Sequence, residues 1–196
     1  MIELPEAQTL ARQLSETVNG KTISQVIAGQ SAHRFAWFQG EPAGYPALFA
    51  GKTVSDTYSV AGYVGLIAED IHLMFHDGVN IRYLTAREVP PKKHQLYIQF
   101  DDQSQLVCTV QMYGGLYAFS EGEFDSPYYQ VAREKPSPLS NEFDRAYFKN
   151  ILNQKPDKLS IKALLATEQR ILGLGNGCLQ DIFLKQRSIC KANYLH

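Results

Sequence analysis

Apolar and polar positions divide the chain into an N-terminal helix, a β-rich stretch and a second helical part. Over residues 4–19 apolar side chains recur at three- and four-residue spacing, which places them on one face of a helix. They are Leu4, Ala7, Leu10, Ala11, Leu14 and Val18. Pro5 suits the first turn of this helix, and Gly20 is a natural stop. A short strand then fits residues 22–28.

Between residues 30 and 51 the pattern is irregular and aromatic, and we expect a loop with a short helix there. The ring-bearing residues of this stretch are His33, Phe35, Trp37, Phe38, Tyr45 and Phe49. Aromatic side chains are more often part of a core than a surface on which bases stack. We therefore expect them to be buried.

From residue 52 to residue 119 short apolar runs indicate β-strands. The candidate strands are residues 53–60, 63–68, 71–75, 80–84, 95–100, 106–111 and 116–119. Turn-forming pairs separate them, namely Ala61-Gly62, Asp77-Gly78, Pro90-Pro91, Asp101-Asp102 and Gly114-Gly115. Seven short strands at this spacing predict an antiparallel β-sandwich.

The remaining third of the chain has a helical pattern. We interpret residues 121–139 as a linker, because Gly122, Pro127, Pro136 and Pro138 break any periodicity. Ser140 can then cap a helix that carries Phe143, Tyr147, Phe148 and Ile151. Further helices should start near Ser160 and near Gly177.

The predicted fold class is therefore α+β. We expect an N-terminal helix and antiparallel β-sandwich over residues 1–120, a linker over residues 121–139 and a helical domain over residues 140–196. The last helical pattern runs on to His196 with no sign of a domain end. We therefore expect the helical domain to be incomplete at its C-terminal end.

Two helical patterns meet at Gly173-Leu174-Gly175-Asn176. Asn176 stands where an N-cap is expected, and the free amides of a helix start, near Lys162, suit a phosphate group. A plain helical hairpin with a glycine turn explains the pattern equally well. A dinucleotide fingerprint does not, since this Gly-x-Gly follows a helix and not a strand. The pattern alone leaves the first two readings open.

The composition of the chain indicates where in the cell the protein is located and which kinds of site it lacks. Cys108, Cys178 and Cys190 show no CxxC spacing, which argues against a zinc site in this chain and against a disulfide framework. No run of 18 apolar residues exists, and Glu3 and Glu6 do not suit a secretory signal. We expect a cytoplasmic protein with no membrane contact.

The net charge of −1 hides an asymmetry along the chain. Residues 1–132 carry 8 Lys/Arg and 14 Asp/Glu, whereas residues 133–196 carry 11 Lys/Arg and 6 Asp/Glu. A basic C-terminal part is typical of an anion-binding module, although a solvated helical surface has the same composition.

Three matches together resemble the formamidopyrimidine-DNA glycosylase/endonuclease VIII family. The start Met1-Ile2-Glu3-Leu4-Pro5-Glu6-Ala7 resembles the family's Met-Pro-Glu-Leu-Pro-Glu-Val. Lys93-His94 before a strand resembles the family's Lys-His. Lys162, followed eleven residues onward by Gly-Leu-Gly-Asn, is similar to the family's helix-two-turn-helix without a gap. The matches cover nearly the whole chain in the right order.

The resemblance implies base-excision repair. Members of the family flip a damaged base out of DNA. Their N-terminal proline amine attacks the sugar C1′ and releases the base through a Schiff base, and elimination then nicks the strand. The Lys and Asn of the helix-two-turn-helix hold phosphates, and a C-terminal zinc finger adds an Arg contact.

Residue by residue, Glu3 matches the family's catalytic glutamate and Glu6 the second acidic residue of the start. Ile2 stands in place of the proline; because Met1 is removed inefficiently before a bulky residue, we expect the reactive amine to be that of Met1. A primary amine can still form a Schiff base. The family's β-hairpin lysine falls at Gly62, so that charge is absent.

For DNA contacts, Lys162 and Asn176 match the phosphate-binding pair, and Gly175 belongs to the same turn. His94 falls on the DNA side. The family's Arg-Phe wedge, which fills the gap left by a flipped base, falls in residues 110–115, where Met112 or Tyr113 can substitute. The remaining candidate contact, matched to another void-filling residue, is Phe75.

We therefore expect a monomeric, nucleoid-associated DNA-repair protein that acts as a glycosylase and lyase on double-stranded DNA with a damaged base or abasic site. A module that recognises bent or damaged DNA without cutting it is the alternative, because the proline and the hairpin lysine are absent. A β-sandwich protein without DNA contact is a third, supported by the acidic N-terminal two-thirds. We expect no cofactor in this chain, and a zinc ion only if a zinc finger follows His196.

Overall fold

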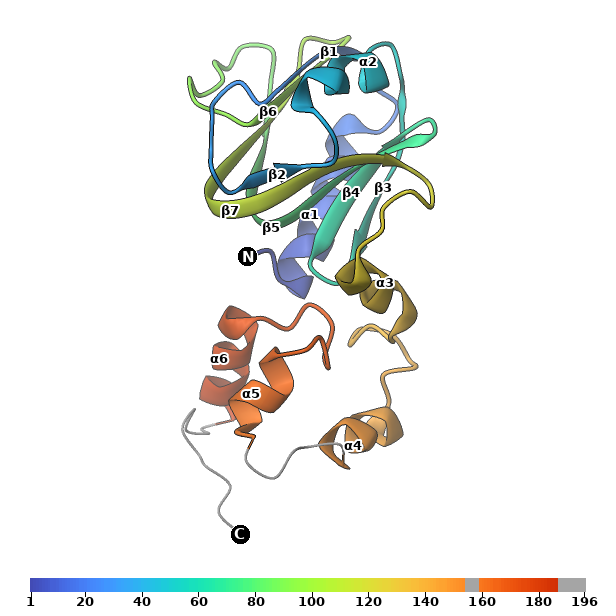
Figure 1. Cartoon of the computed structure of the whole chain (residues 1–196), viewed down its shortest axis with the longest axis vertical. Coiled ribbons are helices and arrows are strands. Elements are labelled where there is room, and N and C mark those ends of the chain that lie inside the picture. Colours follow the sequence, from blue (N-terminus) through green and yellow to red (C-terminus); the bar gives the residue numbers. More distant parts are fainter. Residues whose placement is uncertain (154–158, 187–196) are drawn as a thin grey trace. The chain divides into compact units, whose positions relative to one another are not determined.

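The computed structural model describes residues 1–153 and 159–186, and the chain divides into two compact units after Phe124 (Figure 1). The first unit carries the N-terminal helix and the β-strands, and the second is helical. This arrangement confirms the α+β class. The end of the last predicted helix, residues 189–196, lies outside the described residues.

The strands of the first unit form one sheet in the order β1-β6-β7-β5-β4-β3, with β2 paired to β7. Their bounds are β1 Ile23–Ala28, β2 Ala36–Phe38, β3 Val54–Val60, β4 Tyr63–Ala68, β5 Ile71–Leu84, β6 Leu96–Phe100 and β7 Gln105–Ser120. All pairs are antiparallel except β2 with β7, which is parallel.

Strands β5 and β7 are longer than the sequence predicts. Asp77-Gly78 and Gly114-Gly115 were expected to be turns, but each lies inside one continuous strand. The reason is a register shift between Asp77 and Val79, a β-bulge at which Asp77 adopts a positive φ of 62°. The first half of β5 pairs with the second half of β7, and the second half of β5 with the first half of β7. Both halves contribute to a single core.

Helix α1 (Leu4–Val18) confirms the first predicted element. Its buried residues are Leu4, Ala7, Ala11, Leu14 and Val18, as the helical spacing requires. The helix packs along β3 and β4, and in Figure 1 it runs beside these strands. Burial of this apolar face fixes the N-terminus of the chain against the sheet.

The aromatic stretch before β3 is partly core and partly surface. A 3-10 turn (Pro42–Gly44) leads into helix α2 (Tyr45–Phe49), and Tyr45 and Phe49 are fully buried. The Tyr45 hydroxyl donates to Leu116 O at 2.7 Å, and burial raises the pKa of Tyr45 to about 12. Phe35 and Trp37, in contrast, are exposed, so the expectation of burial is wrong for them.

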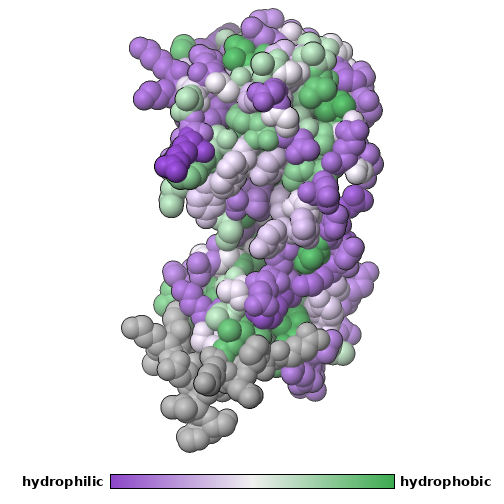
Figure 2. Space-filling view, viewed as in Figure 1, coloured by the Kyte–Doolittle hydropathy of each residue, from purple (hydrophilic) through white to green (hydrophobic). Residues whose placement is uncertain are grey.

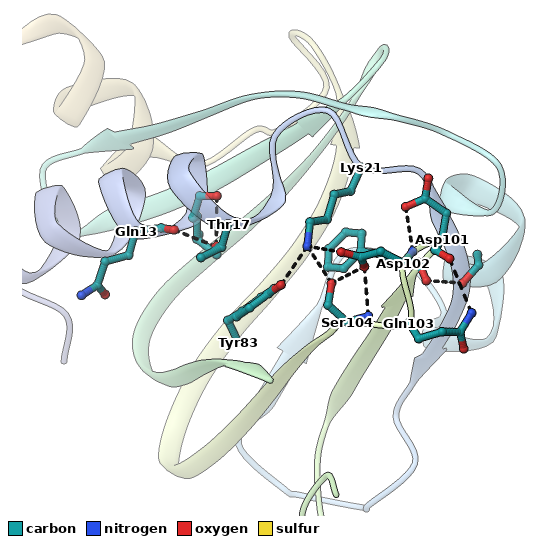
Figure 3. A network of polar contacts seen from close by, with 11 residues as sticks. Gln13, Thr17, Lys21, Tyr83, Asp101, Asp102, Gln103 and Ser104 are labelled. Atoms are coloured by element: carbon teal, nitrogen blue, oxygen red, sulfur yellow. Dashed lines mark hydrogen bonds and ion pairs between the residues drawn. The ribbon is translucent and has the colours of Figure 1, made fainter. Parts of the chain in front are cut away.

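A lysine-centred network fastens one end of the sheet (Figure 3). Lys21 Nζ donates to Asp102 Oδ2 at 2.6 Å, to Tyr83 Oη at 2.8 Å and to Ser104 Oγ at 2.8 Å. The hydrogen bonds from Lys21 and Ser104 lower the pKa of Asp102 to about 2. One side chain thus ties the segment after α1 to the end of β5 and to the β6–β7 turn.

The second unit has four helices in its described part: α3 (Pro127–Glu134), α4 (Arg145–Asn153), α5 (Ile161–Ala166) and α6 (Asn176–Lys185). Helix α3 lies inside the expected linker. Its proline occupies the first turn, where no backbone donor is needed, and Ser126 Oγ accepts from Tyr129 N. A proline that we interpreted as a helix breaker is therefore a helix start.

Helix α4 also begins later than predicted. Asp144 Oδ1 accepts from Tyr147 N at 2.7 Å, so Asp144 and not Ser140 caps this helix. Ser140 instead closes a turn, in which its carbonyl accepts from Phe143 N at 3.2 Å.

In the part of the chain that the structure describes, no helix is long and apolar enough to cross a bilayer. On the face drawn in Figure 2, hydrophilic residues lie among small hydrophobic groups.

Candidate functional site

A cleft in the first unit opens beside the start of the chain. Its volume is about 690 Å³. Its walls come from the N-terminal segment, from the bulged middle of β5 and from the middle of β7. The lining residues are Met1, Ile2, Pro5, Glu6, Thr9, Leu10, Asp77, Gly78, Val79, Asn80, Ile81, Gln111, Met112 and Tyr113. The bulge at Asp77 thus helps to shape the cleft.

Backbone contacts hold the N-terminus at this cleft. Ile2 N donates to Asp77 O at 2.6 Å, and the Ile2 side chain is only 7% exposed. A Cβ at Gly62 would lie 2.6 Å from Ile2 O, so a glycine is needed where the β3–β4 turn meets the N-terminal segment. Met1 is 60% exposed. Of the described residues that line the cleft, Met1 alone carries an amine, since none is Lys.

Glu3 and Glu6 form a reciprocal capping box at the start of α1. The Glu6 carboxylate accepts from Glu3 N at 2.9 Å, and the Glu3 carboxylate accepts from the Glu6 backbone amide. Glu6 lines the cleft, whereas Glu3 is absent from the described lining. The two acidic residues that the sequence marks as catalytic therefore also have a structural role.

Asp77 is a site residue that sequence reasoning missed. Its carboxylate lies 3.1 Å from His76 Nδ1, and the Tyr63 ring stacks on the His76 ring with centroids 4.0 Å apart. The Asp77-Gly78 pair has the sequence of a turn, so nothing in the pattern pointed to a cleft. Only the continuation of β5 through a bulge places a carboxylate there.

The predicted DNA contacts of the first unit differ in their exposure. Met112 is 73% exposed and Tyr113 39% exposed, and both line the cleft, so their assignment remains a prediction. Phe75 is fully buried in the core, which does not support the predicted contact of its side chain with DNA. Its place on β5 points the ring to the inner face of the sheet.

His94 is 5% exposed, which does not support a direct contact with DNA. Its Nδ1 lies 2.9 Å from Pro91 O, and its backbone N donates to Ser31 Oγ at 3.2 Å. The residue instead joins the segment before β6 to the loop before β2.

In the second unit, two consecutive turns join α5 to α6. Arg170 N donates to Thr167 O, and Leu174 N donates to Ile171 O, each at 3.4 Å. The first turn holds Glu168 and Gln169 at positive φ, and the second holds Gly173 at a φ of 66°. The continuous helix that the sequence suggested up to Ile171 ends at Ala166. The glycines therefore mark only the second of the two turns.

The predicted phosphate-binding residues flank this double turn. Lys162 lies in the first turn of α5 and is half-buried. Asn176 is exposed and is the first residue of α6; the N-cap is Gly175, one residue earlier than predicted. The start of α6 therefore lies directly after the second turn, with Lys162 on the helix before the double turn. Phosphate binding by Lys162, Gly175 and Asn176 remains a prediction.

No group of three or more His, Cys, Asp or Glu side chains that could hold a metal ion occurs among the residues with described positions.

Comparison with known proteins decides the family. The profile of the formamidopyrimidine-DNA glycosylase N-terminal domain matches residues 1–119, which contain the whole cleft. The chain belongs to this family. Formamidopyrimidine-DNA glycosylase of Bacillus licheniformis is 29% identical over 181 residues, which is 90% of this chain and 63% of that protein. The Bacillus subtilis enzyme is 31% identical over 183 residues, again 90% and 63%.

Solved structures of this family have the same fold. A complex between Lactococcus lactis Fpg and DNA containing an abasic site matches with a TM-score of 0.76 and 25% identity, covering 92% of this chain and 65% of that one. A complex of the same protein with Fapy-dG-containing DNA matches with a TM-score of 0.75, covering 92% and 67%. The chain therefore spans about two thirds of the length of the relatives it matches.

Proposed function

We propose that this protein binds double-stranded DNA with a damaged base or an abasic site and acts on it as a glycosylase and lyase. The observation that carries the proposal is the cleft that the first two residues line, inside the domain that the family profile matches. Its relatives bear the name formamidopyrimidine-DNA glycosylase, and solved relatives hold DNA with an abasic site or Fapy-dG.

The proposed nucleophile is the α-amine of Met1. The peptide nitrogen of Ile2 cannot act while it carries Met1, since it is an amide that donates to Asp77 O. The amine adds to C1′ of the aldehyde form of an abasic sugar, the carbonyl oxygen leaves as water, and an imine links chain to DNA. On an intact nucleoside the same attack displaces the damaged base from C1′.

The proposed proton carriers are the carboxylates at the cleft. The primary amine loses two protons as the imine forms, and the carbonyl oxygen gains two to leave as water; a departing base gains one. Glu6 and Asp77 both line the cleft, and Glu3 is one hydrogen bond away in the capping box. The family resemblance favours Glu3 as the proton carrier, whereas the position of Glu6 and Asp77 at the cleft favours those two residues. The variants Glu3→Gln, Glu6→Gln and Asp77→Asn should therefore be compared in parallel.

The second unit supplies the proposed phosphate contacts. Lys162 and Asn176 flank the double turn, and the positive end of the α6 helix dipole suits an anion. Loss of one phosphate contact weakens binding and lowers its salt dependence, whatever the DNA sequence. Lys162→Ala and Asn176→Ala are therefore expected to weaken binding of abasic-site DNA about tenfold each.

Borohydride trapping tests the proposal. The chain is incubated with an abasic-site duplex and sodium borohydride, which reduces an imine to a stable amine link. We expect one covalent adduct per chain. Glu3→Gln, Glu6→Gln and Asp77→Asn should slow its formation, and the largest loss identifies the main proton carrier. Failure to form any adduct, with DNA binding intact, would contradict the enzymatic proposal.

A second function, recognition of damaged DNA without cleavage, has its own support in the structure. Both acidic residues of the start are engaged in the capping box, and Ile2 is held against the sheet by Asp77 O and lies close to Gly62. This function predicts salt-sensitive binding that depends on Lys162 and Asn176, with neither adduct nor strand cleavage. In either case we propose a cytoplasmic, nucleoid-associated protein that binds DNA as a monomer.

A further inference from the structure

Exposed aromatic side chains gather at the edge formed by β2 and the middle of β7. Phe35 is 45% exposed, Trp37 43% and Tyr113 39%, and Met112 beside them is 73% exposed. A surface group of large apolar side chains on a folded protein commonly marks a binding site. We refer to Phe35, Trp37 and Tyr113 as the aromatic patch.

The backbone explains why these rings face outward. Along β2, alternate side chains point to opposite faces, so Trp37 lies on one face and Ala36 and Phe38 on the other. Phe35 lies in the turn directly before β2 and is also exposed. Phe38 turns inward and meets the buried Tyr45 edge-on, with ring centroids 5.5 Å apart. Gly114 N donates to Phe35 O at 2.9 Å, which anchors the segment on β7. The exposure of the patch is thus built into the sheet.

The patch continues into the cleft. Trp37 pairs with Gly115 in the β2–β7 register, and its ring lies 6.1 Å from that of Tyr113, tilted by 40°. Tyr113 also lines the cleft beside Met1. A strand that leaves the cleft past Tyr113 would therefore meet Trp37 next.

Positive charge borders the patch. The Arg34 guanidinium lies 5.2 Å from the centre of the Phe35 ring. Ser31 N donates to His94 O at 3.1 Å, and His94 N donates to Ser31 Oγ. These bonds join the loop that leads to the patch to the segment that carries the exposed Lys92 and Lys93. Residues 30–40 contain no Asp or Glu, although the first two-thirds of the chain is acidic overall.

We propose that the aromatic patch is a stacking surface for unpaired nucleobases, with Arg34, Lys92 and Lys93 attracting the phosphates of the same strand. Exposed rings combined with cations are the features with which proteins hold single-stranded nucleic acid. The inference deepens the proposed function, since it assigns a route to a strand next to the cleft. It does not depend on the chemistry of the N-terminal amine.

Trp37 is the single tryptophan of the chain, so its fluorescence reports on the patch alone. The test titrates the whole chain with a single-stranded oligothymidylate, which has no abasic aldehyde, and follows tryptophan emission. We expect saturable quenching that weakens with added salt, because bases stack on the indole while phosphates meet cations.

Variants are measured by fluorescence anisotropy of a labelled oligothymidylate. Trp37→Leu and Phe35→Leu each keep an apolar side chain but lose the ring, and should weaken binding about tenfold, or about 1.4 kcal/mol. Tyr128→Leu is the matched control, since Tyr128 is a 66% exposed aromatic in the second unit, and it should leave affinity unchanged. All three side chains are exposed, so thermal midpoints should stay equal.

Absence of quenching, or equal affinity of Trp37→Leu and the parent chain, would overturn the inference. Equal weakening by Tyr128→Leu would do the same, because it would show a non-specific aromatic effect. Borohydride trapping is independent of these measurements, so a failed stacking test and a failed nucleophile test can be told apart.

Discussion

At the scale of single residues, the start of the chain is defined by two close contacts. Ile2 N donates to Asp77 O at 2.6 Å, and Ile2 O lies where a side chain at Gly62 would be. These contacts direct Met1 into the cleft. A glycine at position 62 thus has a steric reason in this chain.

Gly62→Ala is expected to lower the free energy of unfolding by about 1–3 kcal/mol, because its Cβ would push against a backbone oxygen that cannot rotate away. It should also slow adduct formation with abasic-site DNA, since the displaced N-terminal segment carries Met1. Urea unfolding and borohydride trapping measure the two effects.

Gly44→Ala is the control for this prediction. No atom lies within 4 Å of a Cβ at Gly44, and its φ is negative. Stability and trapping should both remain near those of the parent chain. Equal losses in the two alanine variants would contradict the steric role assigned to Gly62.

At the scale of elements, side chains at the ends of strands and helices decide which segments stay together. The Lys21 network joins three segments with hydrogen bonds of 2.6–2.8 Å. The double turn between α5 and α6 holds two non-glycine residues at positive φ. The Lys21 network stabilises the fold, whereas the positive φ angles in the double turn cost conformational energy.

Lys21→Met should lower the free energy of unfolding by about 1 kcal/mol at neutral pH, since charge-assisted hydrogen bonds are lost and one partner is solvent-exposed. The pKa of Asp102 is lowered from its ordinary value near 3.8 to about 2. Its contribution is therefore complete above pH about 4 and is lost as pH falls through about 2. The difference between parent and variant should shrink over that range.

Lys52→Met serves as the comparison. Lys52 also contacts two carboxylates, with Nζ 3.1 Å from Glu69 Oε2 and 2.7 Å from Asp70 Oδ1, but both partners are exposed. Its loss should affect stability less than that of Lys21. A larger effect at Lys52, or a pH-independent effect at Lys21, would show that the Lys21 network is not what fastens the sheet.

Gln169→Gly should raise the free energy of unfolding by about 1 kcal/mol, because Gln169 has a φ of 48°, where a side chain is strained and glycine is not. Gly173→Ala should lower it by a similar amount, since Gly173 has a φ of 66°. The hydrogen bond from Lys135 Nζ to Gln169 O, 2.9 Å long, involves only the backbone and is kept. Thermal unfolding of both variants checks the opposite signs.

At the scale of the whole molecule, the sequence predicts elements better than it predicts which side chains reach the surface. Helix α1 and most strand positions follow from apolar spacing, because that spacing reflects burial directly. The bulge at Asp77 could not be predicted from the sequence, since an Asp-Gly pair is equally typical of a turn. The same bulge helps to shape the cleft, so the sequence did not predict that Asp77 lines it.

Surface and core aromatics could not be separated by composition either. Phe75 and Trp37 have the same hydrophobic character, yet one is buried inside the sheet and the other is exposed at its edge. The difference lies in strand register and in the parallel β2–β7 pairing, which depend on contacts between distant segments. The turn at Gly173, in contrast, could be predicted, because glycine is the residue that most readily adopts positive φ. The first turn could not, since its positive-φ residues are Glu168 and Gln169.

The central claim is that the first residue's amine reacts in the cleft. The most direct measurement is mass analysis of the borohydride-trapped adduct after proteolysis, on the parent chain and on a variant with two extra residues before Met1. We predict that the DNA remnant maps to the N-terminal peptide and that the extension abolishes trapping. An adduct on an internal lysine, or undiminished trapping by the extended chain, would contradict the account.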